Sequence, residues 1–405
     1  MSKPTTPKMP LRLTSAIQPH AWGSSTLLAD FLGQPNRDGR PQAELWIVAH
    51  PLLPSQAILT DGPQPLDQWI RRSPEAVLGR AVAERFGPEL PFLLKVLAVA
   101  APLSIQCHPD REQAREGFAR EERLGVPRDA PQRNYRDQNH KPELIVALSR
   151  YTALKGLRPV EQTVAYLRAL ESPLLAPAIA ALAQHGEAGL KDFFSILMFL
   201  AKAEQTQVAA RAAQVARAHD ASDLAWNWVL RLHDRYPDDV GVLSPLYLNL
   251  VVLEPGQALF LPAGELHAYL EGLGVEIMAN SDNVLRGGLT PKHVDVPELL
   301  RVLTFRCEAP CVLAPRAQRD GVSVYTTPAE EFELGVLRLA PPVSHGVDET
   351  HGIEILLVLE GRARIVAHDE TLDLGRGAAV LVPATAGSYR LEGEARVARA
   401  RVPRQ

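Results

Sequence analysis

Cysteine is scarce in this chain, with only Cys107, Cys307 and Cys311 among 405 residues. Three cysteines are too few for a disulfide framework, and an odd number leaves at least one thiol free. This count argues against a small domain stapled by disulfides.

The sequence also lacks segments that would direct it to a membrane or to nucleic acid. No apolar run approaches the roughly 18 residues that a membrane span needs, and the opening MSKPTTPKMPLRL has no signal-type apolar core. There is no basic block, and the formal net charge is −4, so neither nucleic acid nor an anionic membrane is an expected partner. We expect a cytoplasmic protein that acts as a monomer or weak oligomer.

What the chain does contain is an ordinary globular composition, 46% hydrophobic and 22% charged. Its length suggests two or three domains. The pattern is β-rich over residues 1–155, and apolar residues then recur at helical spacing over 156–240. The β pattern returns over 241–318 and again over 319–405. We therefore predict a helical domain inserted into a β-rich one, followed by a second β-rich domain.

The stretch EPGQALFLPAGELHAYLE, residues 254–271, predicts two strands joined by a tight turn. The first strand covers Ala258 to Leu261, Pro262 and Gly264 make the turn, and His267 opens the second strand. A histidine held at a fixed corner of a β-barrel suits a metal site. A lone histidine on a strand is more often structural, so this interpretation depends on partners elsewhere in the chain.

This strand–turn–strand unit is repeated near the C-terminus. Gly377 and Pro383 reproduce the spacing of Gly256 and Pro262, and the flanking runs ALFLP and AVLVP match. In the second copy, Ser388 takes the place of the histidine. One copy could therefore bind a metal and the other could not.

Two further segments carry candidate polar partners. In PLSIQCHPD, residues 102–110, strand alternation places Ser104, Gln106 and His108 on one face. Polar side chains in an apolar segment need partners, which a metal and a phosphorylated substrate would supply. Upstream, Lys95 interrupts the apolar run PFLLKVLAVAA. Lys95 either faces an anionic ligand or lies at the edge of the strand, and the sequence does not decide between these alternatives.

Ionisable residues also gather in NHKPE, just before the buried strand LIVAL. Burying Glu143 is costly unless it is paired or bound to a metal. It could instead be a strand-end ion-pair partner that Lys141 neutralises. The polar loop 125–139 next to it could act as a lid. Farther on, the Gly-rich segment SDNVLRGGLTPKHVD presents Arg286, which is either a fixed cation for a substrate oxygen or a loop anchor.

These motifs resemble known families. The spacing from Gly256 to His267 resembles the second signature motif of cupins, although family members often end it with Asn where this chain has Glu271. PLSIQCHPD, NHKPE, LPAGELHAYLEG and SDNVLRGGLTPKHVD together resemble type I phosphomannose isomerases from about Trp22 to Leu303. The family more often has Ala within the Gln-x-His unit, and this chain has Cys107.

The resemblance implies a fold that is mainly β with an α insertion. A catalytic cupin barrel of jelly-roll type is interrupted by the helical domain, and a C-terminal cupin-like barrel without metal ligands follows. It also implies one zinc ion per chain, with these ligands: Gln106, His108, Glu143 and His267.

The implied reaction interconverts mannose 6-phosphate and fructose 6-phosphate through a cis-enediolate, within carbohydrate metabolism such as GDP-mannose biosynthesis. The developing oxyanion needs a fixed positive charge, which a metal and Arg286 would supply. Lys141, Glu276 and His140 are candidate proton carriers, and the sequence does not choose among them. The expected substrate-binding residues are Ser104, Lys95, Trp22 and Tyr269, with Ser104 and Lys95 suited to a phosphate. Considered without the resemblance, Trp22 fits the core better than the lining of a pocket.

Two other functions remain open at this point. The chain could be a different metal cupin, such as an oxygenase with an iron site or a sugar epimerase. It could also be a sugar-binding cupin without catalysis. Iron with oxygen-dependent turnover would favour the former, and tight binding without turnover the latter.

Overall fold

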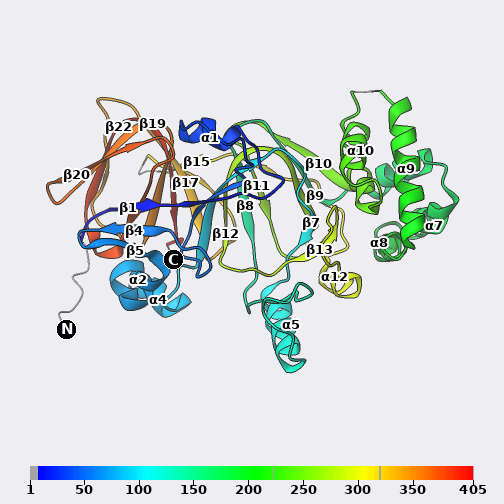
Figure 1. Cartoon of the computed structure of the whole chain (residues 1–405), viewed down its shortest axis with the longest axis horizontal. Helices are drawn as coiled ribbons and strands as arrows, with labels where there is room; N and C mark the ends of the chain where they lie inside the picture. The colour runs from blue at the N-terminus through cyan, green and yellow to red at the C-terminus, as the bar shows by residue number, and fades with distance from the viewer. Residues whose placement is uncertain (1–7, 221, 319–320, 405) are drawn as a thin grey trace.

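The computed structural model describes residues 8–220, 222–318 and 321–404 and is mainly antiparallel β-sheet (Figure 1). Within these residues the strands form two sheets of eleven strands each. In Figure 1 the sheet that carries the C-terminal strands lies at the left, a block of helices lies at the right, and the other sheet lies between them. The predicted mainly β fold with a helical insertion is confirmed. None of the helices in the described residues is long and apolar enough to span a membrane.

The sheet between these two parts is called the central sheet here. Its order is β14-β11-β8-β12-β6-β3-β2, with β7, β9, β10 and β13 attached alongside. Its strands are β2 (Ala16–Gln18), β3 (Glu44–Ile47), β6 (Phe92–Val99), β7 (Ile105–Cys107), β8 (Glu143–Ala147), β9 (Tyr151–Leu157), β10 (Leu248–Leu253), β11 (Ala258–Leu261), β12 (His267–Ala279), β13 (Leu285–Gly288) and β14 (Val312–Leu313).

Strand β12 joins the two parts of the central sheet. Its second half pairs with β6 and β8, with Glu276 opposite Lys95. Its first half pairs with β7 and β9, with His267 opposite Gln106. Strands β8 and β9 are buried along their whole length, because both faces are covered, and this explains their unbroken apolar runs. One long strand therefore carries both ends of the candidate site.

The insertion is helical, as predicted. It consists of α6 (Val160–Ala169), η1 (Pro173–Leu175), α7 (Ala176–His185), η2 (Gly186–Gly189), α8 (Leu190–Met198), α9 (Lys202–Ala218), α10 (Leu224–Arg235), η3 (Val240–Leu243) and α11 (Ser244–Tyr247). Helix breaks fall where Pro173 and Gly186 predict them. The buried faces of these helices share one core with Leu154 and Ile105 of the central sheet.

The other sheet, called the C-terminal sheet here, has the order β15-β16-β17-β22-β19-β21-β1-β4-β5, with β18 on β22 and β20 on β19. Its strands are β1 (Leu11–Thr14), β4 (Gln56–Leu59), β5 (Gly62–Pro65), β15 (Arg316–Ala317), β16 (Ser323–Tyr325), β17 (Glu333–Leu339), β18 (His345–Val347), β19 (Glu354–Ala367), β20 (Glu370–Gly375), β21 (Ala379–Val382) and β22 (Tyr389–Arg401).

Three strands of the C-terminal sheet come from the start of the chain. Strand β1 pairs with β21, with Leu11 opposite Leu381, and β4 and β5 extend the edge. The domain prediction places residues 1–155 together in the first barrel and does not anticipate that β1, β4 and β5 join the C-terminal sheet. The pattern of Leu11–Thr14 shows that a strand forms but not which edge it joins. The predicted boundary at 319 lies outside the described residues.

A shared core holds the two sheets together. It contains Leu45 and Val96 from the central sheet and Leu357 and Ala400 from the C-terminal sheet. The remaining helices lie around the sheets; they are α1 (Leu27–Leu32), α2 (Leu66–Arg72), α3 (Pro74–Leu78), α4 (Arg80–Phe86), α5 (Arg111–Arg123), α12 (Val296–Val302) and η4 (Ala384–Ala386). The C-terminal sheet is therefore packed firmly against the part of the chain that carries the candidate site.

The repeated unit has the same register in both sheets. On β11, the residue before Pro262 pairs with Glu143, and on β21 the residue before Pro383 pairs with Glu354. His267 opens β12 and Tyr389 opens β22, so Tyr389 rather than Ser388 follows the second turn into its strand. The second turn is one residue longer, which a comparison of spacing alone does not reveal.

Candidate metal centre

Three predicted metal ligands converge at one end of the central sheet. His108 follows β7, Glu143 opens β8 and His267 opens β12, and all three are buried. One ligand atom from each lies within 4.8 Å of the others. His108 Nε2 is 3.1 Å from Glu143 Oε1, and His267 Nε2 is 3.5 Å from Glu143 Oε2. Two imidazoles and a carboxylate at these distances form a set that suits zinc.

The Pro-x-Gly turn brings these residues together. Gly264 has φ +78°, a left-handed conformation that a side chain would strain, and a Cβ there would meet Thr304 Oγ1 at 2.5 Å. The Gly264 amide donates to His108 O at 2.8 Å, which ties the turn to the end of β7. His267 then starts its strand opposite Gln106. The turn thus aligns two strands that are about 160 residues apart in the chain.

Each imidazole is oriented by a carbonyl on its far side. His108 Nδ1 donates to Asn283 O at 2.8 Å, and His267 Nδ1 donates to Glu265 O at 3.1 Å. A carbonyl can only accept, so both rings carry a proton on Nδ1 and turn Nε2 toward Glu143. Such outer contacts are typical of metal-ligating histidines.

His108 Nε2 provides the test of whether a metal fits. The atom is buried and, within the described residues, has no hydrogen-bond partner, although it lies within ion-pair distance of Glu143. With its proton on Nδ1, the neutral ring has no hydrogen on Nε2 to donate to that carboxylate. A buried nitrogen lone pair without a partner is costly, and a cation between His108, Glu143 and His267 would satisfy it. The residues present therefore fit a metal.

The local electrostatics also favour metal ligation. Burial lowers the pKa of His108 to about 4, against the opposing charge of Glu143, so the ring is neutral. Burial would raise the pKa of Glu143, but neighbouring His108 and Lys141 outweigh it and hold this pKa well below its usual value. Neutral imidazoles and an ionised carboxylate are the protonation states that a metal requires.

A cavity of about 200 Å³ opens beside these ligands. Its lining contains Glu44, Lys95, Leu97, Leu103, Gln106, Lys141, Glu143, His267, Ala268, Tyr269, Glu276, Met278, Val284 and Arg286. Eight of the twelve predicted site residues are in this set. Among the described residues, Trp22, Ser104, His140 and the fully buried His108 lie outside this lining. Trp22 packs against the core beside the cavity.

Lys95 lies between two carboxylates, with its side chain 11% exposed. Its Nζ lies 3.2 Å from Glu44 Oε2 and 3.9 Å from Glu276 Oε2, and it stands over the Trp46 ring. Burial, followed by the charge of Glu143, raises the pKa of Glu276 to about 8 despite Lys95. Glu44, which the sequence marks only as a strand residue, is thus part of the site. The charge of Lys95 is already matched, so Lys95 is poorly suited to meet a phosphate.

Three cations, Arg136, Arg286 and Lys292, lie close enough to affect one another's charge. Burial, followed by the charge of Arg136, lowers the pKa of Arg286. Burial and then Arg286 and Arg136 lower the pKa of Lys292. Across the described residues, no carboxylate lies within 4.0 Å of the side-chain nitrogens of these three residues. Arg136 is near enough to Asp282 to lower the pKa of that carboxyl, but the three cations still repel one another. Mutually repelling cations of this kind are a natural site for an anion. Arg136 and Lys292 are absent from the sequence prediction because charged loop residues resemble ordinary solvated ones.

His140 faces away from the cavity. Its Nε2 lies 2.8 Å from Glu331 Oε1 and 3.0 Å from Arg111 Nη2. Glu331 belongs to the chain segment between β16 and β17, so this contact joins the candidate site to the C-terminal sheet. The loop 125–139, expected as a lid, is tied down in its second half, where Tyr135 is fully buried.

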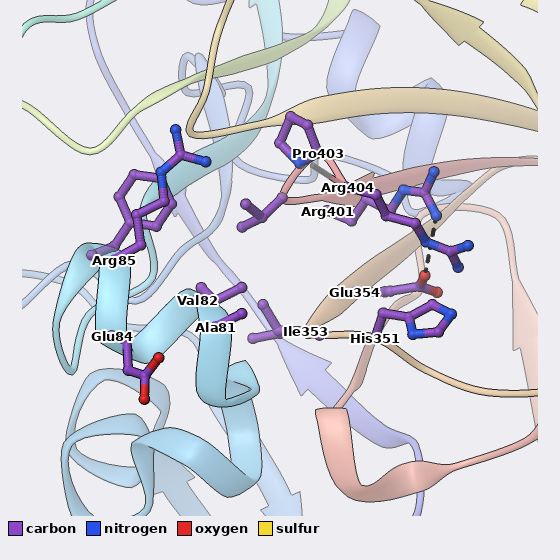
Figure 2. A pocket seen from close by; sticks show the side chains of 13 residues that line it. Ala81, Val82, Glu84, Arg85, His351, Ile353, Glu354, Arg401, Pro403 and Arg404 are labelled. Carbon is purple, nitrogen blue, oxygen red and sulfur yellow. Dashed lines mark ion pairs between the residues drawn. The ribbon is translucent and has the colours of Figure 1, made fainter.

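A larger cavity, about 910 Å³, lies between α4 and the C-terminal sheet (Figure 2). Figure 2 shows Val82 and Arg85 of α4 on one side and Glu354 and Arg401 on the other. Two of its cations are matched by carboxylates, because Arg85 pairs with Glu330 at 2.7 Å and Arg401 has carboxylate partners on β17 and β19. Volume alone does not identify a site of chemistry here.

Glu354, at the rim of this cavity, occupies the place that Glu143 has in the central sheet. Its partners are the Tyr389 hydroxyl and, at 4.0 Å, Arg401 Nη1 rather than two imidazoles. Within the described residues the only group of His, Cys, Asp and Glu placed to hold a metal is His108, Glu143 and His267. The second copy keeps the carboxylate but offers it a hydroxyl and a guanidinium.

Comparisons with known proteins agree with this picture. A family model for the catalytic domain of type I phosphomannose isomerase matches residues 10–160, and a model for the mannose-6-phosphate isomerase cupin domain matches residues 324–402. Mannose-6-phosphate isomerase of Salmonella typhimurium is 37% identical over 394 residues, covering 96% of this chain and 98% of the relative. The human enzyme of that name is 36% identical over 381 residues, covering 86% and 87%.

Solved structures give the same result. A crystal structure described as mannose 6-phosphate isomerase in a holo, zinc-bound form matches with a TM-score of 0.91 and 36% identity, covering 98% of this chain and all of that one. A single-residue mutant of phosphomannose isomerase from Salmonella typhimurium matches with the same score, identity and coverage. The predicted cupin fold class is confirmed by the family model and by these structures.

Proposed function

Because the chain belongs to the type I phosphomannose isomerase family, we propose that it interconverts mannose 6-phosphate and fructose 6-phosphate with one zinc ion per chain. The observation that carries this proposal is the buried cluster of His108, Glu143 and His267 with its unsatisfied Nε2 atom. Gln106 lines the same cavity and would supply a fourth ligand. The reaction would belong to cytoplasmic carbohydrate metabolism, such as GDP-mannose biosynthesis.

The reaction moves one proton between the two carbons at the aldehyde end of the open-chain sugar. A cis-enediolate forms when the proton leaves one carbon, and it collapses when a proton is returned to the other, while the hydroxyl proton passes from one of the two sugar oxygens to the other. Bound zinc would act as a Lewis acid that stabilises the negative charge that develops on the sugar oxygens. Arg286, which lines the cavity, would add a cation that stays charged at any working pH.

Lys141 and Glu276 are the candidates for carrying the proton, because both line the cavity. Lys141 Nζ lies 3.3 Å from Glu143 Oε1, so it can also hold that carboxylate in its ionised form. Glu276 sits across from Lys95 on the neighbouring strand, where Lys95 can stabilise its ionised form. His140, the third candidate from the sequence, would act indirectly, since its ring contacts Glu331 and Arg111.

The phosphate would bind to Arg136 and Lys292, which lie near Arg286 but are not in the lining of the cavity. In the described parts of the chain neither has a carboxylate within 4.0 Å, although Arg136 is near enough to lower the pKa of Asp282. A phosphate dianion would offset the repulsion among these cations and Arg286. Lys95, the cation chosen from the sequence, already faces Glu44 and Glu276. It would instead position the carboxylates at the closed end of the cavity.

A coupled assay tests the proposal. Purified chain with added zinc should form fructose 6-phosphate from mannose 6-phosphate, and a chelator should abolish the reaction until zinc is restored. Absence of product with zinc bound would refute the isomerase function. Turnover that instead required oxygen and iron would point to a different metal cupin.

A further inference from the structure

The C-terminal half of the chain contributes a residue to the neighbourhood of the site. Glu331 lies between β16 and β17, and its side chain is 7% exposed. The flanking residue Phe332 is fully buried in the core that both sheets share. The backbone that carries Glu331 is therefore held by the packing between the two sheets, which gives its side chain a fixed position.

One oxygen of Glu331 meets two groups from the catalytic half. Arg111 Nη2 donates to Glu331 Oε1 at 2.5 Å, and His140 Nε2 lies 2.8 Å from the same oxygen. A carboxylate only accepts, so His140 Nε2 carries a proton that it donates to Glu331. Arg111 Nη2, 3.0 Å from His140 Nε2, is therefore a neighbour and not a donor to this ring. A charge-assisted hydrogen bond of this kind fixes the ring strongly.

The segment that carries His140 leads directly into the candidate site. Lys141 comes next and lines the cavity, with its Nζ 3.3 Å from Glu143. Because Pro142 follows, Lys141 is biased toward an extended backbone. Neighbouring side chains of an extended segment point to opposite sides. Holding His140 against the C-terminal half therefore directs Lys141 toward the cavity.

Other contacts hold the same segment from its other side. Asn283 Nδ2 donates to Asn139 O at 2.9 Å, and the amide of Ala279 donates to Pro142 O at 3.1 Å. These bonds fix the backbone ends of the segment, but they do not hold the His140 ring. In the described structure, Glu331 is the carboxylate that holds that ring.

We propose that Glu331 is a positioning residue, which holds His140 from the C-terminal half and so keeps Lys141 aimed at the sugar in the catalytic cavity. This inference rests on the proposed isomerase function for its catalytic consequence. It gives the C-terminal half a part in the reaction, even though that half has no metal-ligating set among its described residues.

Glu331→Ala tests the inference, with Glu330→Ala as the matched control. Glu330 also carries an ion pair between the halves, to Arg85, but it does not touch the NHKPE segment. We expect Glu331→Ala to lower kcat about tenfold, with KM and zinc content close to wild type. A tenfold loss lies within the ~100-fold loss of rate that a misplacement of about 1 Å can cause. Glu331→Gln keeps an accepting oxygen and should recover most of the rate.

A double variant separates positioning from general loss of packing. If Glu331 acts through His140, the His140→Ala/Glu331→Ala double variant should be no slower than the slower single variant. Losses that multiply, or a Glu331→Ala kcat equal to that of Glu330→Ala, would overturn the inference. If Glu331→Ala failed to fold, the kcat values of Glu331→Gln and His140→Ala would be compared with that of Glu330→Ala in the same way.

Hydrogen exchange tests the same link without any turnover. Amides of residues 137–144 should exchange faster in Glu331→Ala than in wild type and in Glu330→Ala, while the helical insertion should be unchanged. Equal exchange in all three proteins would contradict the positioning role. If the wild-type chain turned over no mannose 6-phosphate but the exchange difference appeared, the proposed function would fail and the positioning contact would stand.

Discussion

Replacing Lys292 with alanine tests where the phosphate binds. Lys292 lies near Arg286 and Arg136, and burial together with those two charges lowers its pKa. We assign Arg136 and Lys292 to the substrate phosphate, which lies at the far end of the sugar from the reacting carbons and from Arg286. Loss of Lys292 should therefore weaken substrate binding and leave the chemical step largely intact.

The expected size follows from the exposure of Lys292. A hydrogen bond to a charged group contributes about 1.5–3 kcal/mol, and the lower end applies because the lysine is exposed to solvent. About 1.5 kcal/mol corresponds to a roughly tenfold rise in KM for mannose 6-phosphate. Thermal stability should be unchanged or slightly higher, because one of three repelling cations is gone. The effect should shrink at high salt.

Steady-state kinetics on two substrates gives the readout. With mannose 6-phosphate the variant should show the raised KM and a kcat close to wild type, whereas slow turnover of unphosphorylated mannose should be equal in both proteins. Lys191→Ala, an exposed lysine on α8, is the matched control and should change neither. A variant that loses kcat with unchanged KM, or loses equally on both substrates, would refute the assignment of the phosphate to this cluster.

Four other perturbations have defined outcomes. His267→Ala should lose zinc, by metal analysis, and activity together; retained stoichiometric zinc would contradict its role as a ligand. Arg286→Ala should keep zinc but lose about 10²-fold or more in kcat/KM, the scale of losing one preorganised electrostatic contact; unchanged turnover would make it a loop anchor. Burial would raise the pKa of Glu331, but His140 and Arg111 bring it below its usual value. Ionised Glu331 therefore stabilises the folded chain above about pH 4.3, and this stabilisation is lost as the pH falls below that value. The melting-temperature gap between wild type and Glu331→Gln should close in acid, and a gap that widens would contradict this. Gly117→Ala should lower the free energy of unfolding by about 1–3 kcal/mol in denaturant, although alanine has the better helix propensity. The reason is that its Cβ would lie 2.4 Å from the Tyr135 ring. A stabilised variant would show that the ring can move.

The sequence identifies the proposed metal ligands because each is marked by local chemistry. His267 follows a Pro-x-Gly turn, Glu143 begins a buried strand, and strand alternation places Gln106 and His108 together. Each signal is local. The prediction that these residues lie close together in space came from the resemblance to a family. The structure brings His108, Glu143 and His267 together as expected. The assignment of their roles in catalysis stays a prediction until it is measured.

The features that the sequence did not reveal depend on partners far along the chain. Glu44 looks like a strand residue until β3 pairs with β6 and sets it beside Lys95. Arg136 looks like a solvated loop residue until the loop brings its charge near Arg286. Strand β1 has an ordinary pattern, and its pairing with β21 is set by tertiary packing. Local patterns specify which elements form, and long-range pairing decides what their side chains meet.

The most direct test of the central claim is a zinc titration of chelator-stripped chain, followed by fructose 6-phosphate formation from mannose 6-phosphate. We predict that the rate rises in proportion to added zinc and levels off at one equivalent per chain, with no such rise in His267→Ala. A chain that binds one equivalent of zinc and forms no fructose 6-phosphate, or that reaches full rate without metal, would contradict this prediction.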